Sequence, residues 1–330
     1  MPSIMKLTRR HCLRLAGAAL AIPALPGLTA AQGWPTKPVR VIVPFAPAGT
    51  TDTFARLIAQ KLGENFGQQF YVENLPGGSG NTGTAQAARA TPDGYTILVA
   101  FSSFVVNPTL FAKIPYDPYK DFAPVTLAVS STHVLTVHPS LPVHSVKDLI
   151  ALIKANPGKY SYASPGVGTQ AHLLAEQFRL SLGLDLPPVT FGGAGPAIVS
   201  VVAGHTPIGF STPVVALPQI KEGNLRALAV TSKSRSQMLP EVPTMAEAGH
   251  PDIEGDSWVG VLVPAATPKD IITSLHREVV KIIVLPDMKK RLVTLGFEHV
   301  GSTPEEFSER IRIEIGTWGK VIQAANIQTR

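Results

Sequence analysis

Short strand patterns alternate with helix patterns from residue 34 onward, and this alternation limits the fold more than any other feature of the sequence. Residues 39–45 form a β-branched run that ends at a loop, and residues 51–63 then place apolar side chains at helical spacing. Further strand patterns lie at residues 70–72, 96–99, 134–137, 160–163, 189–191, 208–210, 225–230 and 258–263. Strands and helices that alternate in this way predict an α/β fold with a mainly parallel sheet covered on both faces.

Two helices near the end of the chain have clear start signals. Thr267 and Thr303 are each followed by proline, and an acidic residue stands three positions after each threonine. A hydroxyl cap, a proline at the first helical position and an acid at the third predict helices that begin at these two threonines.

The first 31 residues have the order of an export signal. Four basic residues without an acid come first, an apolar run follows over residues 15–28, and small residues precede Ala31. This order predicts a signal peptide, cleaved near Ala31, that sends the mature protein to the periplasm. The pair Arg9 and Arg10 fits a twin-arginine signal, and an ordinary secretory signal with two chance arginines is the alternative.

The mature chain is predicted to carry little net charge and no cysteine. The whole sequence has a formal charge of +6, but without Lys6, Arg9, Arg10 and Arg14 its 29 basic residues fall to 25 against 23 acidic ones. No cluster of Lys and Arg is interleaved with aromatics, which argues against nucleic acid as a partner. Because Cys12 is the single cysteine, a disulfide, a thiol nucleophile and a thiolate metal site are excluded from the mature chain.

The loop after the first predicted strand is the first candidate binding site. Ala48 and Gly49 leave room for close approach, and Thr50 and Thr51 add hydroxyl donors before Asp52. Ligands of open α/β sheets bind at the carboxyl ends of strands, where helix N-termini offer free N–H groups and partial positive charge. A carboxylate could bind here without an arginine; the alternative is a turn in which a threonine caps its own helix.

Two later loops also run from a strand into a helix through small residues. One contains Ser164, Gly166, Gly168 and Thr169, and the other spans residues 191–196. Three such loops at strand ends favour a binding site more strongly than one alone, and loops from the two halves of the chain would face each other if each half forms a lobe.

The sequence motifs give little support for nucleotide binding or catalysis. Residues 78–83 match G-x-G-x-x-G, but the preceding strand is not the first, Pro76 intervenes and no acid follows at a strand end about twenty residues on. The phosphate-binding G-x-x-x-x-G-K-[ST] and the G-x-S-x-G nucleophile elbow do not occur. We therefore expect no cofactor and no enzymatic activity.

The histidines and a group of acids are interpreted without catalytic roles. Three histidines straddle a strand and a turn without metal-site spacing, which indicates solvated loop residues rather than a metal site: His133, His138 and His144. His172 lies one turn into its helix and is interpreted as a structural hydrogen-bonding residue. Three alternating acids before Trp258 are interpreted as a solvated turn, with the alternative that one of them reaches the cleft: Asp252, Glu254 and Asp256.

Several of these motifs are similar to those of a known family. Residues 44–52, with Ala55 and Arg56, resemble the opening motif of the Bug receptors, the extracytoplasmic solute receptors of tripartite tricarboxylate transporters. The likeness covers essentially the whole mature chain, at residues 72–74, 80–81, 92–95, 107–108, 116–118, 121–125, 166–172, 225–231, 240–244 and 301–307.

The resemblance implies a type II periplasmic binding protein fold, in which two lobes joined by crossover strands hold a ligand in the cleft between them. We place lobe 1 at residues 34–132 and 233–330 and lobe 2 at residues 133–232, and we expect a monomer. The implied ligand is a small organic mono-, di- or tricarboxylate, aromatic acids included, that is passed to the membrane permease subunits of such a transporter. The two loops would hold its carboxylate partly through ordered water. The residues expected to bind it are Phe45, Ala48, Gly49, Thr50, Thr51, Asp52, Asn81, Ser102, Ser164, Gly166, Gly168, Thr169, His172, Gly193 and Ala194.

The chain departs from the family pattern near these loops. The family usually has glycine at the positions of Ala48 and Thr50, often lysine at Gly192, and an acid at Pro207, so a relative's ligand does not transfer to this chain. Phenylalanines at or near strand ends could line a site for a bulky acid or belong to the core: Phe101, Phe104 and Phe191. Two other functions stay open: a sensory receptor that presents its ligand to a membrane kinase, and a periplasmic hydrolase or isomerase that uses Ser164 and His172.

Overall fold

The computed structural model describes residues 33–328 and divides the chain into two units, residues 1–36 and residues 37–330. The predicted signal peptide lies outside the described residues. Residues 37–328 form two sheets with their covering helices.

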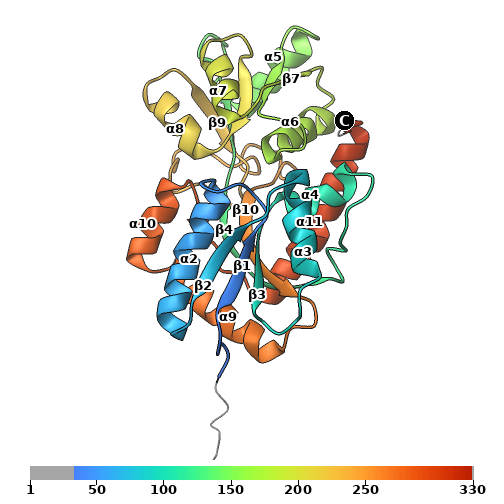
Figure 1. The fold of residues 1–330 in the computed structure, drawn as a ribbon. Helices are drawn as coiled ribbons and strands as arrows, with labels where there is room; N and C mark the ends of the chain where they lie inside the picture. The colour runs from blue at the N-terminus through green and yellow to red at the C-terminus, as the bar shows by residue number, and fades with distance from the viewer. Residues whose placement is uncertain (1–32, 329–330) are drawn as a thin grey trace, which may run out of the picture. The chain divides into compact units, whose positions relative to one another are not determined.

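A six-stranded mixed sheet has the order β11-β4-β10-β3-β1-β2 (Figure 1). Its strands are β1 (Val39–Val43), β2 (Phe70–Asn74), β3 (Thr96–Phe101), β4 (Phe122–Ser131), β10 (Ser257–Pro264) and β11 (Glu298–His299). β1 runs parallel to β2 and β3, whereas β10 is antiparallel to both β3 and β4. All eight residues of β10 are buried, so this strand lies inside the sheet and is covered on both faces.

The helices around this sheet come from both ends of the chain. They are α2 (Thr50–Phe66), the short turn η1 (Gly78–Gly80), α3 (Asn81–Ala88), α4 (Ser103–Leu110), α9 (Lys269–Ile283), α10 (Pro286–Thr294) and α11 (Pro304–Ala324). α11 packs against α4 and β4, and α2 packs against β2 and α9. Residues far apart in the sequence therefore share one core, with Trp258 of β10 edge-on to Phe307 of α11 at 5.2 Å between ring centres.

A second, five-stranded sheet has the order β7-β6-β8-β5-β9. Its strands are β5 (Val134–Val137), β6 (Tyr162–Ser164), β7 (Pro188–Thr190), β8 (Ile208–Ser211) and β9 (Arg226–Val230). Its helices are α5 (Val146–Ala155), α6 (Gln170–Ser181), α7 (Ala194–Val202) and α8 (Pro213–Lys221). β6 is parallel to β7 and β8, and β5 is antiparallel to β8 and β9.

The chain crosses between the sheets after β4 and again between β9 and β10, and hydrogen bonds join the two crossings. Thr231 N donates to His133 O at 2.9 Å, and His133 N donates to Thr231 Oγ1 at 3.0 Å. Thr231 Oγ1 in turn donates to Gly255 O at 2.7 Å. The two crossings therefore run side by side as one bonded unit.

The predicted strands and helices are present, but the predicted sheet type and one strand assignment are wrong. Each sheet mixes parallel and antiparallel pairs because the crossing strands return in the opposite direction. β4, which carries Pro124, was not expected as a strand. Residues 225–230 pair with β5 at the edge of the second sheet, and the chain returns to the first sheet with β10.

One of the two predicted helix caps is confirmed. Thr303 Oγ1 accepts from Glu306 N at 3.1 Å, and Glu306 Oε2 accepts from Thr303 N at 2.9 Å, which completes a capping box for α11. The prediction for Thr267 is wrong: its hydroxyl donates to Pro264 O at 2.7 Å, and Pro268 takes the cap position of α9 without a side-chain bond.

Candidate functional site

A cavity of about 450 Å³ lies at the carboxyl ends of strands from both sheets. Phe45 and Phe101 follow or end strands of the first sheet, and Ala163 and Ser211 belong to strands of the second. His133 contributes to the lining from the first crossing. This is the place where ligands of open α/β sheets bind.

Most of the cavity wall is apolar. Val106 and Leu110 of α4 line it from the first sheet, and Val201 of α7 and Phe210 of β8 line it from the second. Phe45 and Phe101 meet edge-on with ring centres 6.1 Å apart. Apolar walls with a few polar groups are typical of small-molecule sites.

Six of the expected ligand residues line this cavity: Phe45, Ser102, Gly168, Thr169, Gly193 and Ala194. Three others lie near Gly168 in the sequence but outside the lining: Ser164 at the end of β6, Gly166 in the loop and His172 in α6. Ala48 and Asp52 line a second pocket on the side of α2, together with Arg56 and Gln60. Gly49, Thr50, Thr51 and Asn81 line neither pocket.

The start of α6 is built to leave backbone donors open at the cavity. The first four N–H groups of a helix have no partner within the helix. In α6 the first of these, at the cap residue Thr169, donates to Gly166 O, and the fourth, at His172, donates to Thr169 Oγ1. The N–H groups of Gln170 and Ala171 have no partner among residues 33–328, and both residues line the cavity. The partial positive charge of the helix end therefore faces a place where an anion can bind.

His172 holds the loop before α6 in shape. Its Nδ1 accepts from Gly168 N at 3.1 Å, as expected for a structural hydrogen-bonding residue. Burial lowers its pKa, so the ring stays neutral at neutral pH and can keep accepting this bond. Ser164 Oγ is engaged within the same loop, where it accepts from Gly166 N at 3.3 Å.

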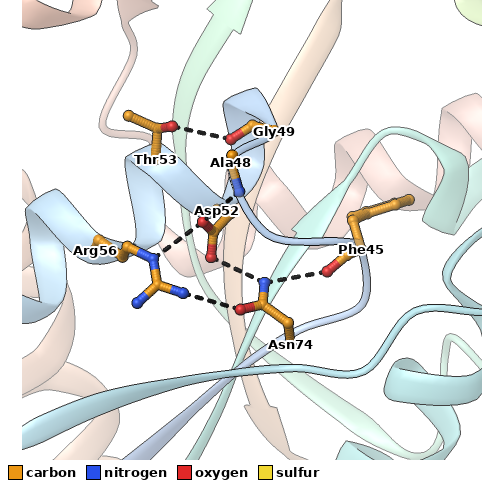
Figure 2. Close-up of polar contacts among 7 residues, drawn as sticks. All are labelled: Phe45, Ala48, Gly49, Asp52, Thr53, Arg56 and Asn74. Carbon is orange, nitrogen blue, oxygen red and sulfur yellow. Dashed lines mark hydrogen bonds and ion pairs between the residues drawn. The ribbon is translucent and has the colours of Figure 1, made fainter.

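Asp52 forms hydrogen bonds that hold the loop after β1 in place (Figure 2), and it is not among the residues that line the cavity. Its Oδ2 accepts from Ala48 N at 2.9 Å and from Arg56 Nε at 3.0 Å, and its Oδ1 accepts from Asn74 Nδ2 at 2.8 Å. Asn74 also donates to Phe45 O at 3.1 Å. These bonds tie the loop to α2 and β2, while Ala48, Gly49 and Thr50 themselves are exposed.

The Asp52 cluster predicts a contribution to stability that is lost in acid. Burial alone would raise the pKa of this carboxyl, but the bonds from Arg56, Asn74 and Ala48 outweigh burial, and the pKa is lowered. A lowered folded-state pKa gives stability above the unfolded pKa of about 3.9, which disappears as pH falls toward the folded value. Asp52→Asn should therefore cost about 2 kcal/mol at pH 7 and progressively less below pH 4.

Urea unfolding midpoints between pH 3 and pH 7 test this prediction. Glu241→Gln also removes one negative charge, at an exposed position away from this cluster, and should move the midpoint little at any pH. A loss for Asp52→Asn that is equal at pH 3 and pH 7 would show that the ionised carboxylate is not the source of the stability.

The side chain of Asn81 also forms hydrogen bonds inside the protein. Its Oδ1 accepts from Asn107 Nδ2 at 2.8 Å and from the Tyr116 hydroxyl at 3.1 Å. Asn107 Nδ2 further donates to Ser79 O at 3.0 Å, so its own Oδ1 faces the protein interior without a partner among the described residues. Asn107 lines the cavity, whereas Asn81 positions it from behind.

Sequence reasoning missed nine polar residues of the cavity lining: Ser79, Ser103, Asn107, His133, Thr136, Gln170, Ser211, Thr212 and Ser257. The interpretation of His133 as a solvated residue is wrong, because it is 3% exposed at the crossing between the two sheets. Burial lowers its pKa to about 4, so it is uncharged at neutral pH. No spacing rule marks these residues, since the tertiary fold alone brings the crossing and the strand ends together.

The three phenylalanines proposed for a bulky acid divide between cavity and core. Phe101 lines the cavity. Phe104 belongs to the core and stacks on Tyr116 with ring centres 5.8 Å apart. Phe191 is partly buried against an apolar cluster of the second sheet and is not among the lining residues.

Residues 33–328 contain neither a candidate metal cluster nor a candidate membrane-spanning helix. No three His, Cys, Asp or Glu side chains are grouped so that they could hold a metal ion in this range. Over the same residues, no helix combines the length and the apolar character that crossing a bilayer requires.

Comparison with known proteins shows the family. The model of the tripartite tricarboxylate transporter family receptors, TctC, matches residues 54–327. The chain belongs to this family. Among curated TctC-type relatives, BugT of Bordetella pertussis is 35% identical over 321 residues, which cover 97% of this chain and 98% of BugT.

Solved TctC-type structures share the fold as well as the sequence. Rpa4515 of R. palustris, solved with adipate, is 34% identical with a TM-score of 0.72 and covers 89% of this chain and 99% of its own. MatC of Rhodopseudomonas palustris, solved with bound malate, is 30% identical with a TM-score of 0.69 and covers 88% of this chain and 100% of its own. The predicted type II periplasmic binding protein fold is thereby confirmed, and the TctC receptors are periplasmic solute-binding proteins.

Proposed function

We propose that this chain captures a small organic carboxylate in the cavity and delivers it to the permease subunits of a tripartite tricarboxylate-type transporter. The start of α6 carries the proposal, since the open N–H groups of Gln170 and Ala171 meet an apolar cavity there. The adipate and malate bound by two relatives support a carboxylate as the ligand class.

The proposed site joins the two loops expected from the sequence. Gly168 and Thr169 hold the carboxylate at the start of α6, and Ser102, Gly193 and Ala194 border the rest of the ligand. Gly49 and Thr50 are exposed and approach the ligand when the lobes close about the two crossings. We keep the lobes at residues 34–132 with 233–330 and at residues 133–232. Ordered water bridges the gap that direct contacts leave.

We assign no chemical step to this site. A base beside Ser164 would need a free imidazole, but His172 Nδ1 is occupied by Gly168 N–H. The Ser164 hydroxyl is itself 3.3 Å from Gly166 O and Gly166 N. The receptor role requires only binding, lobe closure and docking, after export through a signal peptide cleaved near Ala31.

A thermal-shift screen of carboxylates with one, two and three carboxyl groups tests the proposed function. A ligand at one hundred times its Kd should stabilise the protein by about 2.7 kcal/mol and raise the melting temperature accordingly. Neutral sugars and cationic amines serve as controls and should give no shift. A shift from those controls together with none from any acid would contradict the proposal.

A further inference from the structure

Gln170 presents a buried side-chain amide at the start of α6. It is the first residue of the helix after the cap Thr169, it lines the cavity, and it is 6% exposed. Neither its Nε2 nor its Oε1 has a hydrogen-bond partner among residues 33–328. A buried polar group without a partner is costly and rare in a folded protein, so these two atoms need an explanation.

The unpaired amide of Gln170 differs from the other unpaired polar groups of the lining. Asn107, His133 and Ser211 each have one buried side-chain atom without a partner in the described part of the chain. Gln170 has two, a donor and an acceptor, and it still has one of each if the amide is turned over. A ligand that pairs with both atoms therefore has to supply an acceptor and a donor side by side.

The second crossing holds this amide close to the ligand site. An added Cβ at Gly255 would lie 2.8 Å from Gln170 Nε2 and 2.7 Å from Trp318 Cζ2, so the amide fits there because Gly255 has no side chain. Gly255 O accepts from Thr231 Oγ1 at 2.7 Å, and Ser257, two residues later, lines the cavity. Since a helical side chain leans toward the N-terminus of its helix, the amide lies beside the open N–H groups at the start of α6.

A carboxylate with a hydroxyl on the adjacent carbon matches this amide. When the backbone N–H groups of Gln170 and Ala171 hold the carboxylate, one of its oxygens can also accept from the side-chain Nε2. The hydroxyl lies beside that oxygen, at a spacing close to that of the two amide atoms, and can donate to Oε1. A carboxylate without such a hydroxyl has no donor there and leaves Oε1 buried and unpaired.

We propose that Gln170 determines specificity for 2-hydroxycarboxylates, whose carboxylate and adjacent hydroxyl pair with its side-chain amide. This inference rests on the proposed function and narrows its ligand class. It concerns the end of the ligand at α6 and sets no limit on further polar groups elsewhere in the ligand, for which the lining offers hydroxyls such as those of Thr136 and Thr212.

Calorimetric titration with matched pairs of acids at pH 7.5 tests the inference. Phenylacetate is compared with each enantiomer of mandelate, and hexanoate with each enantiomer of 2-hydroxyhexanoate, so that each pair differs in one hydroxyl group. The tightest acid of the thermal-shift screen is likewise compared with its counterpart with or without the 2-hydroxyl. In each pair that binds, the tighter enantiomer of the hydroxy acid should bind about tenfold more tightly, the upper range for one hydrogen bond.

The two ways in which this titration can fail are distinct. Binding of the acids without any advantage for the 2-hydroxyl would overturn the inference and leave the proposed function intact. Absence of binding by every acid of the screen would instead remove the proposed function on which the inference rests.

Gln170→Met removes both amide atoms at nearly constant side-chain length and gives an independent test. The variant should fold as the wild type does, which circular dichroism can verify, because the lost amide has no partner in the described part of the chain. The advantage of the hydroxy acid over its partner should fall from about tenfold to about threefold or less.

Gln177→Met is the matched control on the same helix. Gln177 Nε2 donates to Asp252 O at 2.8 Å, and Gln177 is not among the residues that line the cavity. This variant also loses an amide of α6 that contacts the segment before β10, but it should keep the full advantage of the hydroxy acid. An advantage that survives in Gln170→Met, or that falls equally in both variants, would overturn the inference.

Discussion

Replacing Arg310 by methionine should lower the free energy of unfolding by about 3–5 kcal/mol, because the change leaves a buried carboxylate without its cation. Glu314 is 6% exposed on α11, and its Oε1 pairs with Arg310 Nε. Its Oε2 accepts from Trp258 Nε1 of β10 at 2.8 Å. The Trp258 bond alone cannot offset the desolvation of a full charge.

The stability lost in Arg310→Met should depend on pH, and the titration of the Glu314 and Asp256 carboxyl groups sets the direction of this dependence. Burial raises the pKa of Glu314 despite the opposing effect of Arg310. Burial also raises the pKa of Asp256 to about 7, with Arg310 again opposing and Glu314, Glu254 and Glu298 adding to the rise. A raised folded-state pKa of a carboxyl means that stability is lost as pH rises from its unfolded value of about 4 through its folded value. Without Arg310 both pKa values rise further, so the deficit of Arg310→Met should grow between pH 5 and pH 8.

Urea unfolding followed by tryptophan fluorescence at pH 5, 6.5 and 8 measures this deficit. Arg312→Met is a close control, because Arg312 lies on the same helix and pairs with Glu309 while both side chains are more than half exposed. Exposed pairs contribute little, so the control should unfold at nearly the wild-type urea concentration. An equal loss from both variants, or a loss for Arg310→Met that does not change with pH, would contradict the account of a buried charge.

The burial of Asp256 beside α11 could not be predicted from the sequence. Asp252, Glu254 and Asp256 alternate with apolar or small residues and were interpreted as a solvated turn, but Asp256 Oδ1 is buried without a partner among the described residues. Its burial depends on the crossing, which brings the segment before β10 toward Arg310 and Glu314 of α11. No local pattern in residues 252–258 encodes a contact with a helix fifty residues later.

Local signals predicted local structure well. The threonine, proline and acid pattern at Thr303 specified a capping box because all of its partners lie within one helical turn. The same pattern failed at Thr267, where the hydroxyl found Pro264 O before the helix began. β4 was missed because Pro124 and the polar Thr126 obscure its apolar run, and its pairing with β10 depends on residues more than a hundred positions away.

The candidate site was predictable in part for the same reason. Small residues between a strand and a helix mark Gly168 and Thr169 as a place where backbone donors are open, and both line the cavity. The equivalent reasoning at Gly49 and Thr50 found a loop that the Asp52 bonds hold beside α2 and leave exposed. The sequence does not predict that the buried polar side chains of His133 and Asn107 belong to the site, because only the tertiary fold brings the two distant strand ends together.

Gly168→Ala should weaken carboxylate binding at least a hundredfold, the largest effect expected from a single methyl group in this chain. Gly168 has φ +75°, a conformation that costs an alanine about 1–2 kcal/mol. An added Cβ would also lie 2.5 Å from Leu110 Cδ2, so the leucine or the loop must move. Either movement disturbs the bond from Gly168 N to His172 Nδ1 and with it the open start of α6.

Gly183→Ala is the control that separates the conformational cost of an alanine at positive φ from a loss of affinity for the ligand. Gly183 follows α6 with φ +61°, and no heavy atom lies within 4 Å of an added Cβ. It should therefore lose stability to a similar conformational cost but bind the tightest carboxylate of the screen with wild-type affinity. Calorimetric titration of both variants against that acid, together with their unfolding midpoints, makes the comparison. A selective loss of binding in Gly168→Ala would be due to crowding at the cavity, because Gly183→Ala carries the same backbone cost. If folded Gly168→Ala instead binds the acid within threefold of the wild-type affinity, the ligand does not occupy the start of α6.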